Sequence, residues 1–179
     1  METKEYRTID KSIYPKGPWT DEPDKVQWPD PATGLPCLAV RQPRYGNWCG
    51  YVGVAPGHPL HGVPAYADAE NGIERGANDV VSAHGGITFT DVCMAEGDEA
   101  QRVCHVPGPG EPEHVWWIGF DCAHCYDFSP FRATIMAEVS EDKEKMHRLF
   151  GPNPHEIYRD LDYVKRECAE LAAQLRAAA

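Results

Sequence analysis

The sequence predicts an α+β protein: a mainly antiparallel sheet of about four to six short strands with C-terminal helices packed on it. Short runs of β-branched and aromatic residues are separated by turns rich in glycine and proline, of which the chain has 16 each. Closely spaced short strands of this kind favour antiparallel pairing. A helical repeat of apolar residues is clear only near the C-terminus, so strands precede helices along the chain.

A chain of 179 residues fits one domain with an N-terminal extension. We expect residues 1–36 to form an extended arm, because six prolines there exclude a long helix. Residues 37–179 are predicted to form a single globular α+β domain. Trp19 and Trp28 are expected to pin the polar arm across its own domain, the alternative being an aromatic clamp over a planar ligand.

The strand candidates, in chain order, are 37–41, 48–54, 80–90, 101–106 and 114–122. A turn at 45–47 predicts that the first two form a hairpin. In 80–90 the apolar side chains point inward and His84 lies on the opposite, polar side. In 101–106, His105 alternates with Cys104.

The richest stretch is 114–127, a strand followed by a polar loop. Alternation puts Trp116, Ile118, Phe120 and Cys122 on one face and Val115, Trp117, Gly119 and Asp121 on the other. The strand then delivers Asp121, His124, Cys125 and Asp127 to the loop at its end. Loops on rigid scaffolds are where sites are usually built.

Two helices are predicted after this stretch. Ser140 can cap a segment that runs through Phe150. Asn153 followed by Pro154 predicts the start of a long C-terminal helix, 154–177. Its apolar positions recur at spacings of four and three, at Ile157, Leu161, Val164, Cys168, Leu171 and Leu175. This seam is expected to pack on the sheet or to pair with its copy in a homo-oligomer.

The charge pattern limits the partners. The net charge is −11, and between residues 47 and 130 twelve acids face only Arg75 and Arg102. Such a block repels a nucleic-acid backbone, so we expect no long nucleic acid as a partner. We expect no membrane partner either, because no apolar run is long enough to span a bilayer. The first residues lack a secretory pattern, so a cytoplasmic location is expected, with seven reduced cysteines.

The histidines and carboxylates suggest a site. If the strands share one sheet, His84, His105 and Asp121 project from one polar face, near His124 and Asp127. His58 and His61 come from a stiff loop of proline and glycine. Two chemistries fit this set: His84, His105, Asp121 and His124 act as general acid and base, or they hold zinc or another divalent metal. The zincin pattern of two histidines one helical turn apart is missing.

Two further groups are open to interpretation. Cys122 and Cys125, with Cys104, His105 and Cys93, could close a structural zinc site, or the cysteines are ordinary buried or loop thiols. A metal-free pocket could use the backbone of Gly85 and Gly86, stack a base on aromatic rings and meet phosphates with arginines. Its candidates are Trp48, Tyr51, Trp116, Trp117, Arg41, Arg44 and Arg132. The alternative is that these rings belong to the core.

Five segments together resemble a family of small proteins from bacteriophages and prophages. They are GNWCGYVGV at 46–54, GHPLHG at 57–62, HGGITF at 84–89, WWIGFDCAH at 116–124 with Asp127, and the helix at 158–175. The resemblance implies a phage context, in the host cytoplasm, and raises the expectation of host-takeover or anti-defence roles.

We therefore expect a protein that binds, and in the enzyme version hydrolyses, a small anionic or nucleotide-like ligand at a His- and Asp-lined sheet face. In the phage context this would sequester or degrade a nucleotide signal. The alternatives are a zinc-dependent hydrolase of another small substrate and a non-enzymatic protein-interaction or inhibitor module that uses the seam of the C-terminal helix.

Overall fold

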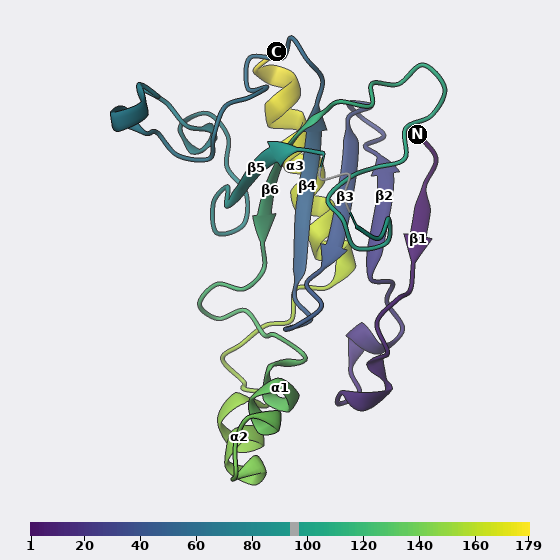
Figure 1. Ribbon diagram of the computed structural model, residues 1–179, viewed down its shortest axis with the longest axis vertical. Helices are drawn as coiled ribbons and strands as arrows, with labels where there is room; N and C mark the ends of the chain where they lie inside the picture. Colours follow the sequence, from purple (N-terminus) through teal and green to yellow (C-terminus); the bar gives the residue numbers. More distant parts are fainter. Residues whose placement is uncertain (94–96) are drawn as a thin grey trace.

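The protein, described by a computed structural model at residues 1–93 and 97–179, is built on one six-stranded antiparallel sheet (Figure 1). The strands in spatial order are β1 (Lys4–Tyr6), β2 (Lys25–Pro29), β3 (Pro36–Arg41), β4 (Trp48–Val54), β6 (Trp116–Asp121) and β5 (Phe89–Val92). Every neighbouring pair is antiparallel. The predicted α+β class is confirmed.

The centre of the sheet follows the sequence pattern. β3 and β4 form the predicted hairpin, with Leu38 opposite Tyr51. Along β6 and the residue before it the side chains alternate as expected, because Ile118 and Phe120 enter one apolar cluster while Val115 and Trp117 enter another. Each face of the central strands is therefore buried, which explains why these strands are almost continuously apolar.

The N-terminal segment is part of the sheet rather than an arm laid over it. Residues 1–36 are extended as predicted, but they supply β1 and β2. Trp19 is buried beside Phe128 and Phe131, and Trp28 packs on the main core, so the tryptophans pin this segment as expected. The prediction of a separate arm missed the pairing of β2 with β3, which depends on a partner strand rather than on local composition.

Buried charges complete this attachment. The Arg41 guanidinium contacts Glu22 at 2.6 Å and lies 4.2 Å from the ring centre of Trp48. Glu22 also accepts hydrogen bonds from the Tyr158 hydroxyl and from the Leu161 backbone N–H. The N-terminal segment, the sheet and the C-terminal helix are thus joined through one carboxylate.

Two predicted strands are corrected. In 80–90 only Phe89 onward is a strand, because Gly85 and Gly86 have φ of +67° and +95°, which a strand cannot contain. Segment 101–106 is not a strand either. Its backbone is bonded by side chains of β2: Lys25 Nζ donates to the Cys104 carbonyl at 2.8 Å, and Gln27 Nε2 donates to the Val106 carbonyl at 3.2 Å.

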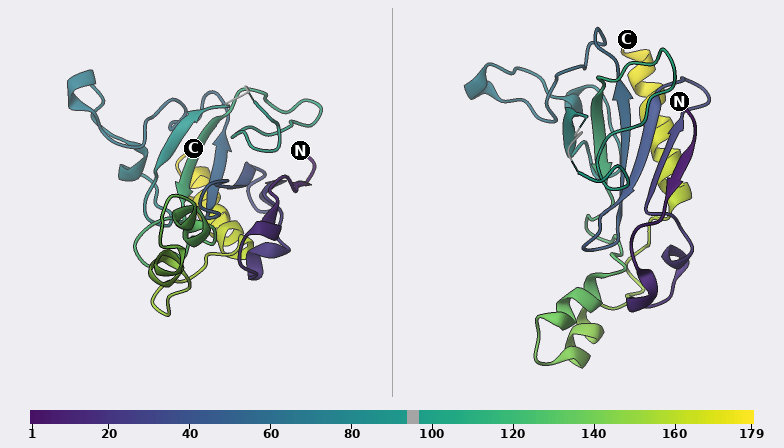
Figure 2. Two further views of the ribbon diagram at one scale, coloured as in Figure 1. Left: turned by 60° about the horizontal axis from the view of Figure 1, so that its bottom comes forward. Right: turned by 45° about the vertical axis from the view of Figure 1, so that its right-hand side comes forward.

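The helices are α1 (Arg132–Glu138), α2 (Lys143–Phe150) and α3 (Leu161–Ala177), with 3-10 turns at Lys11–Ile13, Pro18–Thr20, Ala69–Asn71 and Ala77–Asp79. α2 is capped by Asp142 rather than by Ser140. α1 and α2 form a hairpin that projects beyond one end of the sheet (Figures 1 and 2). Within the described residues, no helix combines the length and the apolar character needed to cross a bilayer.

α3 covers one face of the sheet, behind β3 and β4 in Figure 1. It begins at Leu161 rather than at 154, because the Asp160 carboxylate caps it and Ile157 is engaged in a bridge with Asp127. The seam residues Val164, Cys168, Leu171 and Leu175 are buried in the main core, the first of the two arrangements that the sequence allowed. A homo-oligomer remains a prediction, but this seam is already occupied.

Candidate functional site

Three segments meet where β6 ends: the loop around His84, the loop after Asp121, and the first two turns of α3. Their polar side chains form one connected cluster, which we call the His84 cluster. It consists of His84, Asp121, His124, Asp127, Arg159, Tyr163 and Glu167.

His84 and Asp127 form the centre of the cluster. His84 Nε2 lies 2.6 Å from Asp127 Oδ2, and Arg159 Nε donates to Asp127 Oδ1 at 2.9 Å. The Asp127 side chain is only 1% exposed. Burial alone would raise the pKa of Asp127, but the bonds from His84 and Arg159 hold it below its usual value. Asp127 is therefore a carboxylate at neutral pH and orients the imidazole.

The second nitrogen of His84 is also engaged. Nδ1 lies 2.9 Å from the Tyr163 hydroxyl. Burial, aided by Glu167, raises the pKa of Tyr163 to about 12, so the phenol keeps its proton at neutral pH. In the tautomer whose Nε2–H donates to Asp127, Nδ1 accepts the phenolic proton of Tyr163, and the Glu167 carboxylate is a second acceptor beside the same hydroxyl. The backbone N–H of His84 donates to Glu167 Oε2 at 3.0 Å, which fastens the loop to α3.

His124 and Asp121 form a second pair beside the first. His124 Nε2 lies 3.6 Å from Asp121 Oδ1, and the rings of His124 and His84 are 5.6 Å apart. Thr88 Oγ1 donates to Asp121 Oδ2 at 2.9 Å and holds that carboxylate. Within residues 1–93 and 97–179, His124 Nε2 is buried beside Gly85 and has no hydrogen-bond partner. Both side chains of this pair are about one-third exposed, so it forms the open side of the cluster.

The backbone of the 122–128 loop explains how His124 and Asp127 are placed. Asp127 N–H donates to the His124 carbonyl at 3.0 Å, and His124 N–H donates to the Asp127 carboxylate at 3.1 Å. Tyr126 adopts a φ of +73°, which turns the chain so that Asp127 points inward and Tyr126 points to solvent. Bonds between this loop and Ile157 then fix it beside the start of α3.

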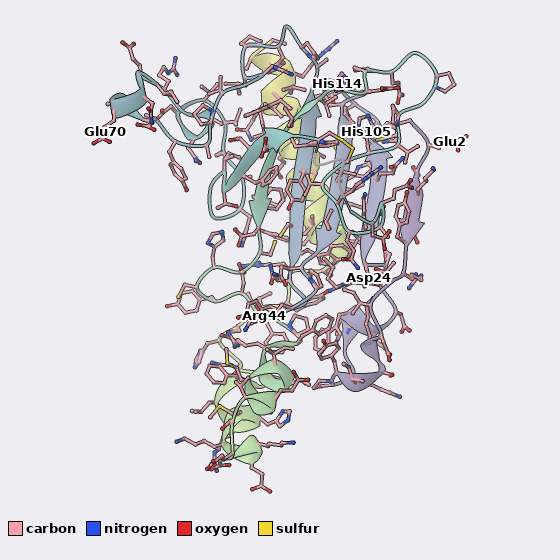
Figure 3. The ribbon with its side chains drawn as sticks, viewed as in Figure 1. Glu2, Asp24, Arg44, Glu70, His105 and His114 are labelled. Atoms are coloured by element: carbon pink, nitrogen blue, oxygen red, sulfur yellow. A yellow bond between two sulfur atoms is a disulfide. The ribbon has the colours of Figure 1, made fainter. Side chains whose placement is uncertain are left out.

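His105, predicted to join this set, lies elsewhere. Its ring is 5.4 Å from that of Trp117, on the sheet face opposite α3. Figure 3 shows it toward the upper end of the sheet, whereas β6 ends at the lower end. The prediction that His105 shares a face with His84 and Asp121 is wrong, because 101–106 is not a strand of the sheet and its side chains do not follow the alternation of a strand.

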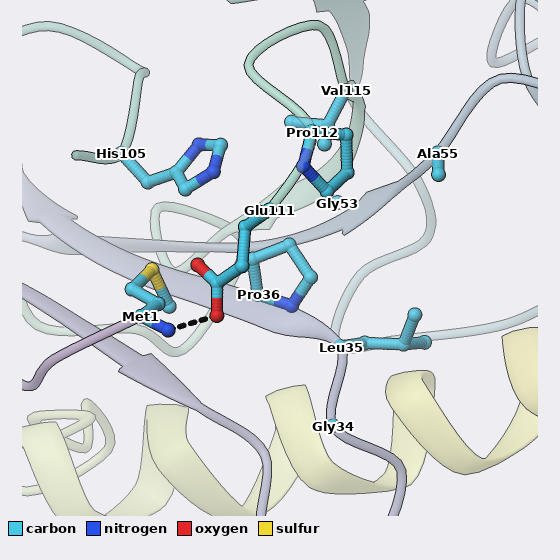
Figure 4. A pocket seen from close by; sticks show the side chains of 10 residues that line it. All are labelled: Met1, Gly34, Leu35, Pro36, Gly53, Ala55, His105, Glu111, Pro112 and Val115. Atoms are coloured by element: carbon cyan, nitrogen blue, oxygen red, sulfur yellow. Dashed lines mark hydrogen bonds and ion pairs between the residues drawn. The ribbon is translucent and has the colours of Figure 1, made fainter. Parts of the chain in front are cut away.

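His105 lines a separate pocket of about 180 Å³ (Figure 4). The other lining residues are Met1, Gly34, Leu35, Pro36, Gly53, Ala55, Glu111, Pro112 and Val115. Burial lowers the pKa of His105, so its ring is neutral. None of the residues of the His84 cluster lines this pocket, so His105 is separated from the cluster.

His58 and His61 also stay outside the cluster. His58 Nδ1 accepts from Leu60 N–H at 3.0 Å, and Nε2 bonds to the Leu175 carbonyl at 2.9 Å, near the C-terminal end of α3. His58 therefore has a structural contact at both nitrogens. The His61 ring lies 6.1 Å from that of Trp116, next to the same loop.

The expected aromatic platform is corrected as well. Trp48 and Trp117 are fully buried, and Tyr51 is 7% exposed, so these rings have no open face for a base. Of the candidate arginines, Arg41 is buried and pairs with Glu22. The rings belong to the core because the central strands are covered on both faces, the alternative that the sequence allowed.

Gly85 and Gly86 have a role that differs from the expected one. A Cβ on Gly85 would overlap the His124 imidazole, so glycine lets His124 pack against the His84 loop. Gly86 N–H donates to the Ala83 carbonyl at 2.9 Å and completes the turn. These glycines therefore bring two histidines together, whereas the sequence pattern predicts that they bring backbone to a ligand.

The cysteines do not form the zinc group considered above. Cys122 is buried in the main core, Cys125 is exposed, and Cys104 is joined to Cys93 by a disulfide, which corrects the expectation of reduced thiols. In the part of the chain that the structure describes, no three His, Cys, Asp or Glu side chains are grouped so that they could hold a metal ion. Zinc therefore stays a prediction from the sequence.

Three members of the cluster, Arg159, Tyr163 and Glu167, were not predicted, because sequence patterns alone assign the C-terminal helix no part in chemistry. A signal was present: the three residues are four apart, and this spacing places them along one side of a helix next to the apolar seam. Nothing in the sequence says that this side faces His84.

Comparison of the chain with models of protein families, with curated proteins and with solved structures finds no match. The structure itself therefore gives the description of the protein. It is an antiparallel α+β domain with two histidine–carboxylate pairs at one end of the sheet.

Proposed function

We propose that the His84 cluster is an acid–base site that binds and hydrolyses a small nucleotide-like ligand. The observation that carries the proposal is the pairing of two imidazoles, each with its own carboxylate, at a ring separation of 5.6 Å. Hydrolysis of a phosphate ester needs one group to take a proton and another to give one. Two adjacent imidazoles supply both near neutral pH.

Two arginines beside Tyr163 offer positive charge to an anionic ligand. The Arg159 and Arg166 guanidinium carbons lie 4.8 Å and 5.8 Å from the ring centre of Tyr163. Guanidinium groups are suited to phosphate oxygens. The Arg166 side chain is exposed, whereas the Arg159 guanidinium already forms an ion pair with Asp127. Acids predominate in the chain and in the cluster itself, where Asp121, Asp127 and Glu167 lie, and this supports a small ligand over a long nucleic acid.

The two pairs divide the work. His84, held by the buried Asp127, is suited to take a proton, because the carboxylate stabilises the imidazolium that forms. The His124 side chain is one-third exposed while its Nε2 is buried, so Nδ1 is the nitrogen that would protonate the leaving oxygen. If the protein acts in a phage infection, as its resemblance to small phage proteins implies, this reaction would remove a nucleotide signal of the host.

The test is incubation of the purified protein with linear and cyclic nucleotides, followed by chromatography of the solution and of ligand released on denaturation. Hydrolysis yields fragments. His84→Gln can keep a donor to Asp127 but cannot carry a proton, and His124→Ala removes the second imidazole. Each should lower turnover by about 10²-fold or more.

His147→Ala is the matched control, because His147 is exposed on α2 outside the cluster. It should turn over like the wild type. A wild-type protein that retains intact nucleotide without cleaving it would reduce the proposal to sequestration. A protein that neither retains nor alters any nucleotide would contradict it, as would turnover unaffected by both cluster variants.

A further inference from the structure

Both ring nitrogens of His84 are occupied, and this restricts what the residue can do. Nε2 is bonded to Asp127 at 2.6 Å and Nδ1 to the Tyr163 hydroxyl at 2.9 Å. The side chain is only 14% exposed. Neither nitrogen is free to meet a ligand or a water molecule. Whatever His84 does to a bound ligand must therefore pass through Tyr163.

The order of the three groups is that of an activated nucleophile. A carboxylate orients an imidazole, and the imidazole accepts the proton of a hydroxyl. Here the hydroxyl is phenolic. We infer that Tyr163 is the nucleophile of the site and that Asp127, His84 and Tyr163 form a catalytic triad that cleaves phosphodiesters through a phosphotyrosine intermediate. This inference rests on the proposed function and names its scissile group.

The first step balances without a cofactor. The Tyr163 oxygen attacks phosphorus while its proton moves to His84 Nδ1, and Asp127 stabilises the resulting imidazolium. The bond from phosphorus to the leaving oxygen breaks, and that oxygen takes a proton from His124. The products are an alcohol and a phosphodiester linkage to Tyr163.

The second step reverses the roles. His124, now neutral, takes a proton from water, and the water oxygen attacks phosphorus. The bond from phosphorus to the Tyr163 oxygen breaks, and the phenol regains its proton from His84. One water molecule is consumed and all side chains return to their starting state. Arg159 lies beside the ring and opposes the raised pKa of Tyr163, so it favours the phenolate character that both steps need.

The probe that tests this is bis(4-nitrophenyl) phosphate, a phosphodiester whose leaving group needs little protonation. His124→Ala should therefore still complete the first step but fail in the second. We expect one equivalent of nitrophenolate per protein and a phosphoryl adduct on the peptide that contains Tyr163, detected by mass spectrometry after acid quench.

Tyr163→Phe should form no adduct and lose turnover by about 10³-fold or more. Tyr126→Phe is the matched control, because Tyr126 is 65% exposed in the neighbouring loop, and it should behave like the wild type. Wild-type turnover by Tyr163→Phe, or turnover without an adduct at Tyr163, would overturn the triad and leave the proposed function standing. A wild-type protein that cleaves neither this probe nor any nucleotide would instead overturn the proposed function.

Discussion

The imidazole of His124 packs directly on the Cα of Gly85, in the space where any other residue would carry its Cβ. Gly85 also has a φ of +67°. Gly85→Ala should therefore push His124 away from His84 and lower turnover by about 10-fold or more, a loss equivalent to about 1.4 kcal/mol. Steady-state kinetics on any substrate found for the wild type measures this effect.

The backbone cost of that substitution needs its own control. Gly72 has a φ of +74°, and no atom lies within 4 Å of the position that a Cβ would take there. Gly72→Ala should cost about 1 kcal/mol of folding free energy through backbone strain, the same kind of strain that Gly85→Ala introduces. It should leave turnover unchanged. Equal turnover in the two variants would show that the contact between Gly85 and His124 has no catalytic role.

Asp127→Asn should destabilise the protein by about 3 kcal/mol at pH 7, because it leaves the half-buried Arg159 without its charge partner. The pKa of Asp127 is lower in the folded protein than its ordinary 3.8. Its stabilisation is therefore complete above that value and is lost as the pH falls through the folded pKa.

Urea unfolding of wild type and variant should show a gap that narrows below about pH 4. Asp162→Asn, an exposed neighbour in the first turn of α3, serves as control and should cost less than about 1 kcal/mol. If the difference in the free energy of unfolding between wild type and Asp127→Asn does not change with pH, Asp127 does not stabilise the fold through its negative charge.

Lys25 gives the opposite pH dependence. It is fully buried and donates to backbone carbonyls of the 98–106 segment, and burial together with Arg102 lowers its pKa to about 8. Between about pH 8 and 10.5 it is neutral in the folded protein and charged in the unfolded chain, so the free energy of unfolding rises with pH.

Relative to Lys25→Met, the wild type should therefore gain up to about 3 kcal/mol of stability across this interval. Denaturant unfolding at pH 7.5, 9 and 10 measures the difference. Lys16→Met, at an exposed position, should show no such gain. If the wild type instead loses stability relative to Lys25→Met over this pH range, the pKa of Lys25 is not lowered in the folded protein.

Glu22→Gln should cost about 2 kcal/mol, because the buried Arg41 would lose the carboxylate 2.6 Å away but keep Asp24 at 3.4 Å. It would also weaken the cap on the Leu161 N–H, so α3 should fray at its start. Hydrogen exchange of the first turn of α3 and urea unfolding measure the two effects. Asp21→Asn, exposed and adjacent in sequence, should leave both unchanged.

Metal removal tests the zinc hypothesis against the proposed site. The two histidine–carboxylate pairs can transfer protons without an ion, so turnover should survive dialysis against EDTA. Stoichiometric zinc in the purified protein, together with loss of turnover in EDTA and recovery on adding zinc, would favour the metal-dependent alternative.

Local pattern was sufficient for the middle of the fold. The strands at 37–41, 48–54 and 114–122 were predictable because alternation and β-branched or aromatic content are properties of adjacent residues. The seam of α3 was visible for the same reason. The ends of the helices were harder to predict. The side chains of Asn153 and Asp160 each accept a hydrogen bond from a backbone N–H two or three residues further on, but only the bond at Asp160 begins a helix.

The site was only half readable. The sequence by itself determined that Asp121, His124 and Asp127 follow an apolar strand, whereas it placed His84 inside a strand that in fact begins at Phe89. Only the tertiary structure decided that His105 lies on the other face and that Tyr163 completes the cluster. The physical reason is distance along the chain: Asp127 is 43 residues from His84 and Tyr163 is 79, so their hydrogen bonds depend on how loops and helix pack, which no local periodicity records.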